Sequence, residues 1–117
     1  MIRKEDLMIG DKLYYQTEEG LMVTTLDWQD LKWVSEDEKG FNLAHKPIPL
    51  EEDILLKCGN EKELMSDGFY RYNLNGVGID MPYFEFCHND NSIEIKYVHQ
   101  YQQLYKSLTQ QDLKVEL

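Results

Sequence analysis

The dipeptide Asn75-Gly76, which stands between two runs of alternating residues, constrains the fold of this chain more than any other feature of its sequence. Asn-Gly supplies the two positive φ angles of a type I′ turn, and this turn joins antiparallel strands through only two residues. Tyr and Leu alternate with polar residues in 69–74, and Val, Ile and Met alternate in 77–81, so each run can bury one apolar face. The sequence therefore predicts a β-hairpin here and an antiparallel sheet around it.

A second hairpin is expected directly after the first. Residues 83–87 and 92–96 combine aromatic and β-branched side chains, and the polar turn His88-Asn89-Asp90-Asn91 separates them. Together the two hairpins predict a four-stranded antiparallel sheet in the C-terminal part of the chain.

The segment after this sheet has the strongest helical periodicity in the chain. Its apolar and aromatic residues follow helical spacing: Tyr97, Val98, Tyr101, Leu104, Tyr105 and Leu108. We expect an amphipathic helix that packs this stripe on the sheet and presents a neutral polar surface on its other side, formed by His99, Gln102, Gln103, Lys106 and Gln110. Residues 113–117 alternate again and could add a final edge strand.

The N-terminal part of the chain has the pattern of short strands separated by turns. Residues 12–16 and 21–27 predict a hairpin, and the runs 31–35 and 41–43 predict two further strands, because aromatic and β-branched residues gather there. Residues 1–46 are therefore expected to form a small antiparallel β meander with a barrel-like form.

Prolines and acids mark the connection between these two parts. Pro47 and Pro49 favour an extended connector, because proline disfavours helix in the residue before it. The acids of 51–53 suit a helix N-terminus, where the helix dipole favours negative charge, and Gly59 suits the position after the helix end. We expect a short helix over 51–59, while residues 60–68 are ambiguous between a helical turn and a loop.

These elements add up to a single α+β domain, and 117 residues is the length of one domain. Its first sub-region, residues 1–46, is the β meander. Its second, residues 47–117, has the order helix, four strands and helix, followed at most by one more strand.

The two ends and the cysteines predict where the protein resides. The N-terminus turns acidic where a signal peptide would carry an apolar run, and no apolar stretch approaches the roughly 20 residues of a membrane span. Cys58 and Cys87 lack the CxxC spacing of a redox or zinc motif. We expect a cytoplasmic protein without a membrane partner, whose two thiols are reduced and buried.

The charge of the chain is strongly negative and unevenly spread along the sequence. The formal net charge is -10 and the pI is near 4.6. Residues 1–67 hold 16 acids and 8 bases, whereas residues 68–117 hold 6 acids and 4 bases. Because a polyanion is repelled by such a chain, direct binding of nucleic acid is not expected. The acids of turns and of the helix start form a candidate interaction surface: Glu18, Glu19, Glu36, Asp37, Glu38, Glu51, Glu52 and Asp53.

Few residues point to catalysis or to a cofactor. The three histidines form no HxH or HExxH motif, and the run 87–90, Cys-His-Asn-Asp, is a weak metal motif because adjacent strand residues point to opposite faces. A nucleophile and base pair from Cys58 or Cys87 with His88 or His99 is equally unspecific. We therefore expect no metal and no cofactor, assign no catalytic residue, and favour a protein that is not an enzyme.

Three segments resemble a known family. Residues 47–59 (PIPLEEDILLKCG), 95–109 (IKYVHQYQQLYKSLT) and 6–15 (DLMIGDKLYY) resemble small uncharacterised proteins of bacterial genomes and their prophages. The family pattern has a glycine after the final Leu-Thr, where this chain has Gln110. The resemblance implies a phage-associated protein and brings no known activity, so no site residue is carried over.

Three hypotheses for function follow from these observations. The first is a non-enzymatic accessory protein of a phage or other mobile element that binds a partner protein through its acidic surface. The second is a small-ligand binder or enzyme with a pocket between the C-terminal helix and the sheet, near Tyr97, His99 and Tyr101. The third is a DNA mimic, whose carboxylates imitate a row of phosphates. A homo-oligomer stays open in each case.

Overall fold

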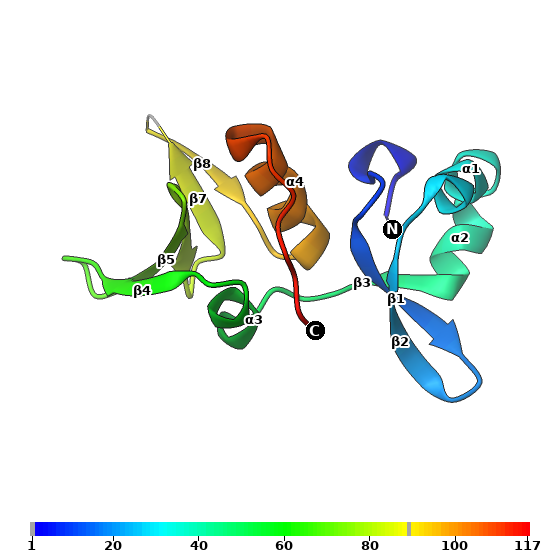
Figure 1. The fold of residues 1–117 in the computed structure, drawn as a ribbon, viewed down its shortest axis with the longest axis horizontal. Helices are drawn as coiled ribbons and strands as arrows, with labels where there is room; N and C mark the ends of the chain where they lie inside the picture. Colours follow the sequence, from blue (N-terminus) through cyan, green and yellow to red (C-terminus); the bar gives the residue numbers. More distant parts are fainter. Residues whose placement is uncertain (1, 89) are drawn as a thin grey trace. The chain divides into compact units, whose positions relative to one another are not determined.

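The computed structural model describes residues 2–88 and 90–117, and the chain forms two compact units (Figure 1). Unit 1 comprises Met1–Ile48 and Tyr97–Gln103, and unit 2 comprises Pro49–Lys96 and Leu104–Leu117. Helices and antiparallel strands occur in both units, which confirms the α+β class. The first boundary lies close to the expected division at residues 46 and 47, and the single domain stays a prediction.

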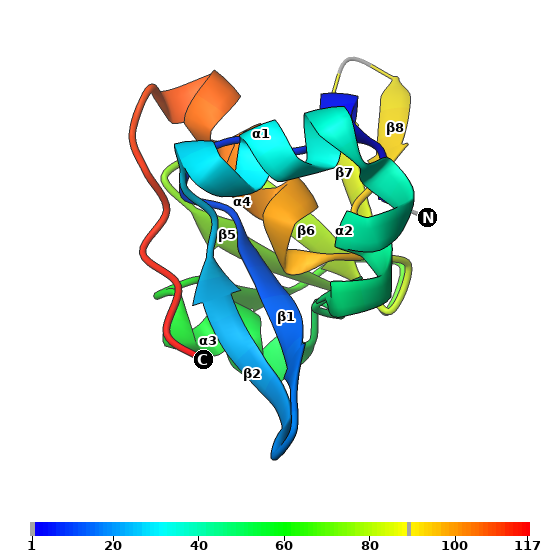
Figure 2. The ribbon, with the colours of Figure 1, turned by 90° about the vertical axis from the view of Figure 1, so that its right-hand side faces the viewer.

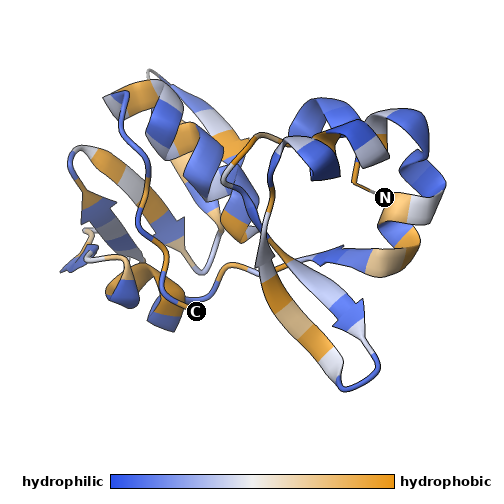
Figure 3. Ribbon diagram, turned by 45° about the vertical axis from the view of Figure 1, so that its right-hand side comes forward, coloured by the Kyte–Doolittle hydropathy of each residue, from blue (hydrophilic) through white to orange (hydrophobic). Residues whose placement is uncertain are grey.

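Unit 1 consists of a three-stranded antiparallel sheet and short helices, with strand order β2-β1-β3. Its elements are the 3-10 helix η1 (Lys4–Asp6), β1 (Lys12–Thr17), β2 (Gly20–Thr25), α1 (Trp28–Glu36), α2 (Glu38–Ala44), β3 (His45–Pro47) and the first turns of α4 (Val98–Thr109). The β1–β2 hairpin confirms the prediction for residues 12–27. It extends away from α1 and α2 (Figure 2), and its strand β2 presents an exposed apolar run at residues 21–23 (Figure 3).

The two strands predicted at 31–35 and 41–43 are wrong, because these residues lie in helices α1 and α2. Asp27 caps α1: its carboxylate accepts hydrogen bonds from the backbone N–H groups of Gln29 and Asp30, and Asp30 accepts one in return from the N–H of Asp27. Asp37 ends this helix and caps the next one by accepting from the N–H of Gly40. The expected meander is therefore a hairpin, a helix pair and a short third strand.

Helix formation gives unit 1 its core. The buried cluster contains Ile2, Leu7, Leu13, Leu26, Val34 and Phe41, with Leu31 and Trp33 packed against it. Val34 and Phe41 come from the two segments that were expected to be strands. Because a helical face buries residues three or four positions apart, Leu31 and Val34 of α1 reach the same cluster, whereas Trp28 at the start of the helix is exposed.

Unit 2 contains helix α3 and a five-stranded antiparallel meander in which neighbouring strands follow chain order. Its elements are α3 (Glu52–Lys57), β4 (Glu61–Leu64), β5 (Tyr70–Leu74), β6 (Val77–Met81), β7 (Glu85–His88) and β8 (Asn91–Glu94). Asn75 and Gly76 have φ angles of 50° and 85°, and Leu74 pairs with Val77, as the type I′ hairpin requires. The observed sheet has one strand more than the four that were predicted, because residues 60–68, whose structure was left undecided, supply β4.

Some of the other predictions for unit 2 are confirmed and one is not. The short helix before the sheet is confirmed, and Gly59 follows it with a φ of 96°. The second hairpin forms from β7 and β8, although Asn89 of its predicted turn lies outside the described residues. The further strand left open at 113–117 does not form, since these described residues belong to neither a helix nor a strand.

Helix α4 confirms the predicted helix but not the two faces assigned to it. Val98, Tyr101 and Tyr105 of the stripe are buried, as expected. His99 and Gln102 are also buried, so the neutral polar surface expected there is wrong. The helix ends at Thr109, and Gln110 then adopts a φ of 62°, a left-handed conformation that favours glycine. Among the described residues, no helix has the length and apolar character needed to span a membrane.

Candidate functional site

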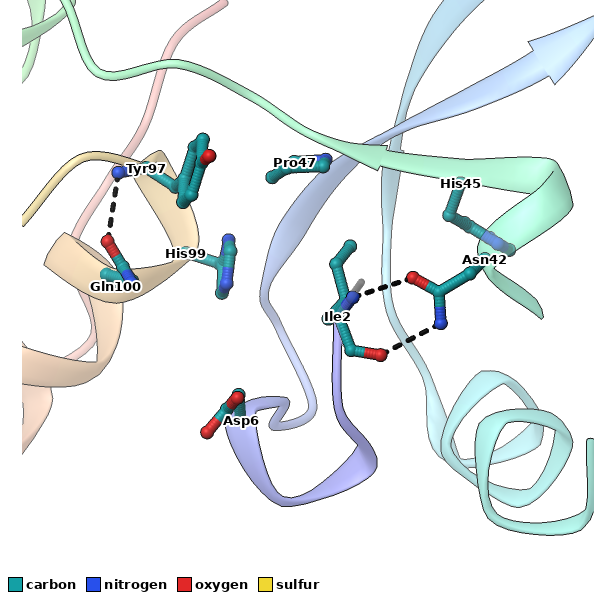
Figure 4. Close-up of a pocket in the computed structure, with 8 residues that line it drawn as sticks. All are labelled: Ile2, Asp6, Asn42, His45, Pro47, Tyr97, His99 and Gln100. Atoms are coloured by element: carbon teal, nitrogen blue, oxygen red, sulfur yellow. Dashed lines mark hydrogen bonds between the residues drawn. The ribbon is translucent and has the colours of Figure 1, made fainter. Parts of the chain in front are cut away.

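A cavity of about 370 Å³ lies within unit 1 (Figure 4). Four segments of that unit line it: the N-terminal segment, α2, β3 and the start of α4. The lining residues are Ile2, Asp6, Asn42, His45, Pro47, Tyr97, His99 and Gln100. These positions span almost the whole sequence, so the cavity is a product of tertiary structure.

Asn42 holds the N-terminal wall of the pocket. Its Oδ1 accepts a hydrogen bond from the backbone N–H of Ile2 at 2.7 Å, and its Nδ2 donates to the carbonyl oxygens of Ile2 and Glu38, each at 2.8 Å (Figure 4). Both polar atoms of this side chain are therefore hydrogen-bonded to backbone groups. Asn42 therefore positions the wall and is not the group that a ligand would contact first.

Two glutamines hold the start of α4 within unit 1. Gln102 accepts from the N–H of Lys12 at 2.8 Å and donates to the carbonyl of Gly10 at 2.9 Å. Gln103 donates to the carbonyl of Asp6 at 2.6 Å and to the Asp11 carboxylate at 2.7 Å. These contacts explain why the polar side of the helix is not free surface: it satisfies backbone groups of the N-terminal segment.

Among the described residues, the Nδ1 atom of His99 is one of two buried side-chain polar atoms without a hydrogen-bond partner; the other is the hydroxyl oxygen of Tyr72. The His99 side chain lines the cavity, the residue is only 4% exposed, and its Nδ1 has no hydrogen bond. Burial lowers the pKa of His99, and the negative charge of Asp6 opposes that shift. The ring is therefore neutral at pH 7. An unsatisfied buried group of this kind costs about 1–3 kcal/mol.

Tyr97 and His45 complete the aromatic part of the lining. The rings of Tyr97 and His99 are nearly parallel, with 9° between their planes and 5.9 Å between their centroids. Nδ1 of His45 is hydrogen-bonded to the carbonyl oxygen of Phe41 at 2.8 Å. The His45 ring stacks on the Phe41 ring, with 3.8 Å between the ring centroids. His45 is thus anchored in the core, whereas His99 is not anchored by any hydrogen bond at Nδ1.

The predicted pocket residues are placed differently by the structure. Tyr97 and His99 line the cavity, while Tyr101 is completely buried and does not. The expected pocket faced the C-terminal sheet, but the observed lining includes β3 of the three-stranded sheet and no residue of the five-stranded one. Periodicity in α4 could identify the helix but not the N-terminal segment that packs against its start.

The candidate acidic residues do not gather in one unit. Glu18 and Glu19 lie in the β1–β2 turn and residues 36–38 lie at the α1–α2 junction, at opposite ends of unit 1 (Figures 1 and 2), while residues 51–53 belong to unit 2. Unit 1 holds 10 acids and 6 bases, and unit 2 holds 12 acids and 6 bases. The excess counted along the first half of the sequence therefore does not belong to unit 1 alone.

These acids nevertheless remain available to a partner. All eight are exposed except the half-buried Glu38, which accepts a hydrogen bond from the N–H of Lys4. In the part of the chain that the structure describes, the ion pairs use other acids: Asp6, Asp80, Glu94 and Asp112. Seven of the eight acidic residues are thus exposed, and none of the eight takes part in these four ion pairs.

Within residues 2–88 and 90–117, no three or more His, Cys, Asp or Glu residues gather into a group that could hold a metal ion. Asn89 of the weak motif at 87–90 lies outside these residues. Burial raises the pKa of Cys58 to about 11, and burial followed by the charge of Asp80 raises the pKa of Cys87, so neither supplies much thiolate at neutral pH. Cys87 is exposed and Cys58 is half-buried, so the expectation of two buried thiols is wrong.

No family model, curated protein or solved structure matches this chain.

Proposed function

We propose that this protein is a non-enzymatic binding protein whose pocket in unit 1 holds a small organic ligand. The single observation that carries this proposal is the neutral, buried His99, which lines a 370 Å³ cavity and has no partner for Nδ1. Ligand pockets typically enclose about 300–1,000 Å³ and combine apolar walls with a few polar groups. The unsatisfied imidazole gives such a ligand a hydrogen bond that the protein itself does not complete.

The lining supports binding more than catalysis. It contains carboxylate, amide, imidazole and phenol groups, but no serine, cysteine or lysine that could act as a covalent nucleophile. His99 alone could exchange a proton, yet a reaction would need a second group to attack or to stabilise charge. Binding requires only the cavity and its hydrogen bond.

The test is an NMR titration of the labelled protein with a library of small aromatic and polar compounds. We expect ligands that shift the amide signals of Tyr97 and Gln100, and we expect His99→Phe to weaken them at least about tenfold, since the loss of one buried hydrogen bond changes affinity by about 1.4 kcal/mol or more. His88→Phe in β7 is the matched control and leaves binding unchanged. Hits whose affinity does not depend on His99 would contradict the proposal.

We propose partner binding through the acidic residues as a second function. The supporting observation is their exposure and their absence from the four ion pairs of the described chain. As the resemblance to prophage proteins suggests, the partner would be a host or phage protein with a basic surface. DNA mimicry has less support, because the acid groups of unit 1 lie at its opposite ends and form no row there.

Charge reversal separates this second function from the first. Glu18→Lys with Glu19→Lys should abolish salt-sensitive capture of a specific basic partner from the natural host, while Glu61→Lys with Glu63→Lys in β4 makes the same change in charge elsewhere. If both variants lose partner capture equally, the effect depends only on net charge. That result would contradict a defined acidic surface.

A further inference from the structure

We infer that the unit 1 pocket selects a planar cationic group, an amidinium or guanidinium, over an anion of the same shape. This inference rests on the proposed ligand-binding function and adds the chemical class of the ligand. It is carried by the charges, hydrogen-bonding groups and ring planes that line the cavity.

The charge of the lining is the first argument. Asp6 is the acid among the eight lining residues, and none of the eight is a lysine or arginine. An anion in this cavity would meet a carboxylate and no cationic lining residue, whereas a cation would meet an acceptor of opposite charge. The acidic chain as a whole, with a net charge of -10, adds to this preference.

Asp6 can exchange its present partner for such a cation. Its Oδ2 accepts from Nε of Arg3 at 3.2 Å and its Oδ1 from Nη2 at 3.5 Å, but the side chains of Arg3 and Asp6 are 67% and 49% exposed. An ion pair as exposed as this one contributes little to stability. The carboxylate is therefore held near the cavity without being committed to Arg3.

His99 supplies the second polar contact without positive charge. Burial lowers its pKa, so the ring is neutral at pH 7 and offers one nitrogen as an acceptor. In the tautomer that carries its proton on Nε2, the unpartnered Nδ1 is the acceptor, and it then favours, like the carboxylate of Asp6, a ligand that brings N–H donors. Amidinium and guanidinium groups carry several such donors in one plane.

The ring planes favour a flat ligand. Figure 4 shows Tyr97 and His99 side by side, with Ile2 and Pro47 facing them. The two rings are parallel to within 9°, with 5.9 Å between their centroids, and they lie opposite two apolar side chains. A planar cation packs its face on such rings and is attracted by their π electrons.

Benzamidinium, benzamide and benzoate test this inference, because they share one shape and differ in charge. We expect isothermal titration calorimetry and NMR at pH 7 to show benzamidinium binding at least about tenfold more tightly than benzoate, with benzamide between them. Raising the salt concentration should narrow this difference. Benzoate binding as tightly as benzamidinium overturns the inference and leaves the binding pocket intact, whereas the absence of any ligand dependent on His99 overturns the proposed function itself.

Variants of the N-terminal segment identify the carboxylate. Asp6→Asn should lower benzamidinium affinity about threefold to tenfold and leave benzamide affinity unchanged, and Arg3→Gln should raise benzamidinium affinity by freeing Asp6. Glu5→Gln is the matched control, because it makes the same change in charge at a residue that does not line the cavity. Equal losses in the Glu5 and Asp6 variants overturn the role of Asp6.

Methylguanidinium and a short peptide with one internal arginine distinguish the source of the cation. Tighter binding of the peptide indicates a protein side chain as the natural ligand, and tighter binding of methylguanidinium indicates a free small molecule. Failure of both to bind where benzamidinium binds overturns the guanidinium part of the inference.

Discussion

Asp11 of unit 1 and Asp80 of unit 2 are both buried carboxylates, and the two units satisfy them in different ways. Asp80 accepts two hydrogen bonds from the guanidinium of Arg71 on the neighbouring strand, at 2.7 and 3.1 Å. Asp11 accepts only from neutral donors, the N–H of Met8 at 2.9 Å and Nε2 of Gln103 at 2.7 Å. Unit 2 thus pairs a buried carboxylate with a guanidinium, whereas unit 1 surrounds one with neutral donors, and burial raises the pKa of Asp11 to about 6.

The largest effect is expected from Arg71→Met, which leaves the carboxylate of Asp80 buried without a counter-charge. The free energy of unfolding should fall by about 3–4 kcal/mol, measured by urea denaturation. Arg3→Met removes the exposed pair with Asp6 instead and should cost less than about 1 kcal/mol. Addition of Asp80→Asn should restore most of the stability lost in Arg71→Met. Similar losses in the two arginine variants would contradict the distinction between buried and exposed pairs.

Asp11→Asn should raise the free energy of unfolding, whereas Arg71→Met lowers it. Burial raises the pKa of Asp11 from 3.8 to about 6, so the folded state holds its proton more tightly than the unfolded chain does. Stability contributed by that proton is present below about pH 4 and is lost as the pH rises through about 6. The variant should therefore be more stable than the natural chain by about 2 kcal/mol at pH 7 and equally stable at pH 3.5.

The measurement is urea unfolding of both chains at the two pH values. A difference that stays constant between pH 3.5 and 7 would show that Asp11 does not titrate in this range. A less stable variant at pH 7 would show that the charged carboxylate is favoured by its two donors.

Gln110→Gly should change the stability of the fold least, and this change should not depend on pH. Gln110 has a φ of 62° directly after α4, and glycine adopts this conformation without the strain of a side chain. We expect a gain of about 1 kcal/mol at both pH 4 and pH 7, read as a rise in melting temperature. Gln111→Gly is the control one residue on. A loss of stability in Gln110→Gly would mean that its side chain contributes more than the backbone strain costs.

Elements with strong local signals could be predicted from sequence, and elements set by tertiary contacts could not. The Asn75-Gly76 hairpin, the helix before Gly59 and the helix over 98–109 each carry turn, cap or periodic residues within a few positions. In α1, the β-forming pair Trp33-Val34 led to the wrong prediction of a strand, although a capping box begins at Asp27. The residues Asp27 and Asp30, three positions apart before an apolar run, were the signal that identifies this helix.

The pocket could be predicted only in part for the same reason. Tyr97 and His99 were identifiable from the helix pattern, whereas Ile2, Asn42 and Asp6 reach the cavity from segments far away in the sequence. The burial of Gln102 also depends on its hydrogen bonds to Gly10 and Lys12, about 90 residues earlier. Helical periodicity reports which residues share a face, but not which distant backbone that face will meet.

The chain leaves unit 1 after Ile48 and returns to it at Tyr97, and this has a consequence for protein synthesis. The ribosome must make all of residues 49–96 before His99, Gln102 and Gln103 can complete unit 1. A nascent chain that carries only the first 48 residues has the hairpin and the helix pair in its sequence but lacks three of the eight residues that line the cavity. The proposed ligand binding therefore requires residues 97–100 as well as the first 48, and a fragment ending at residue 48 should not bind.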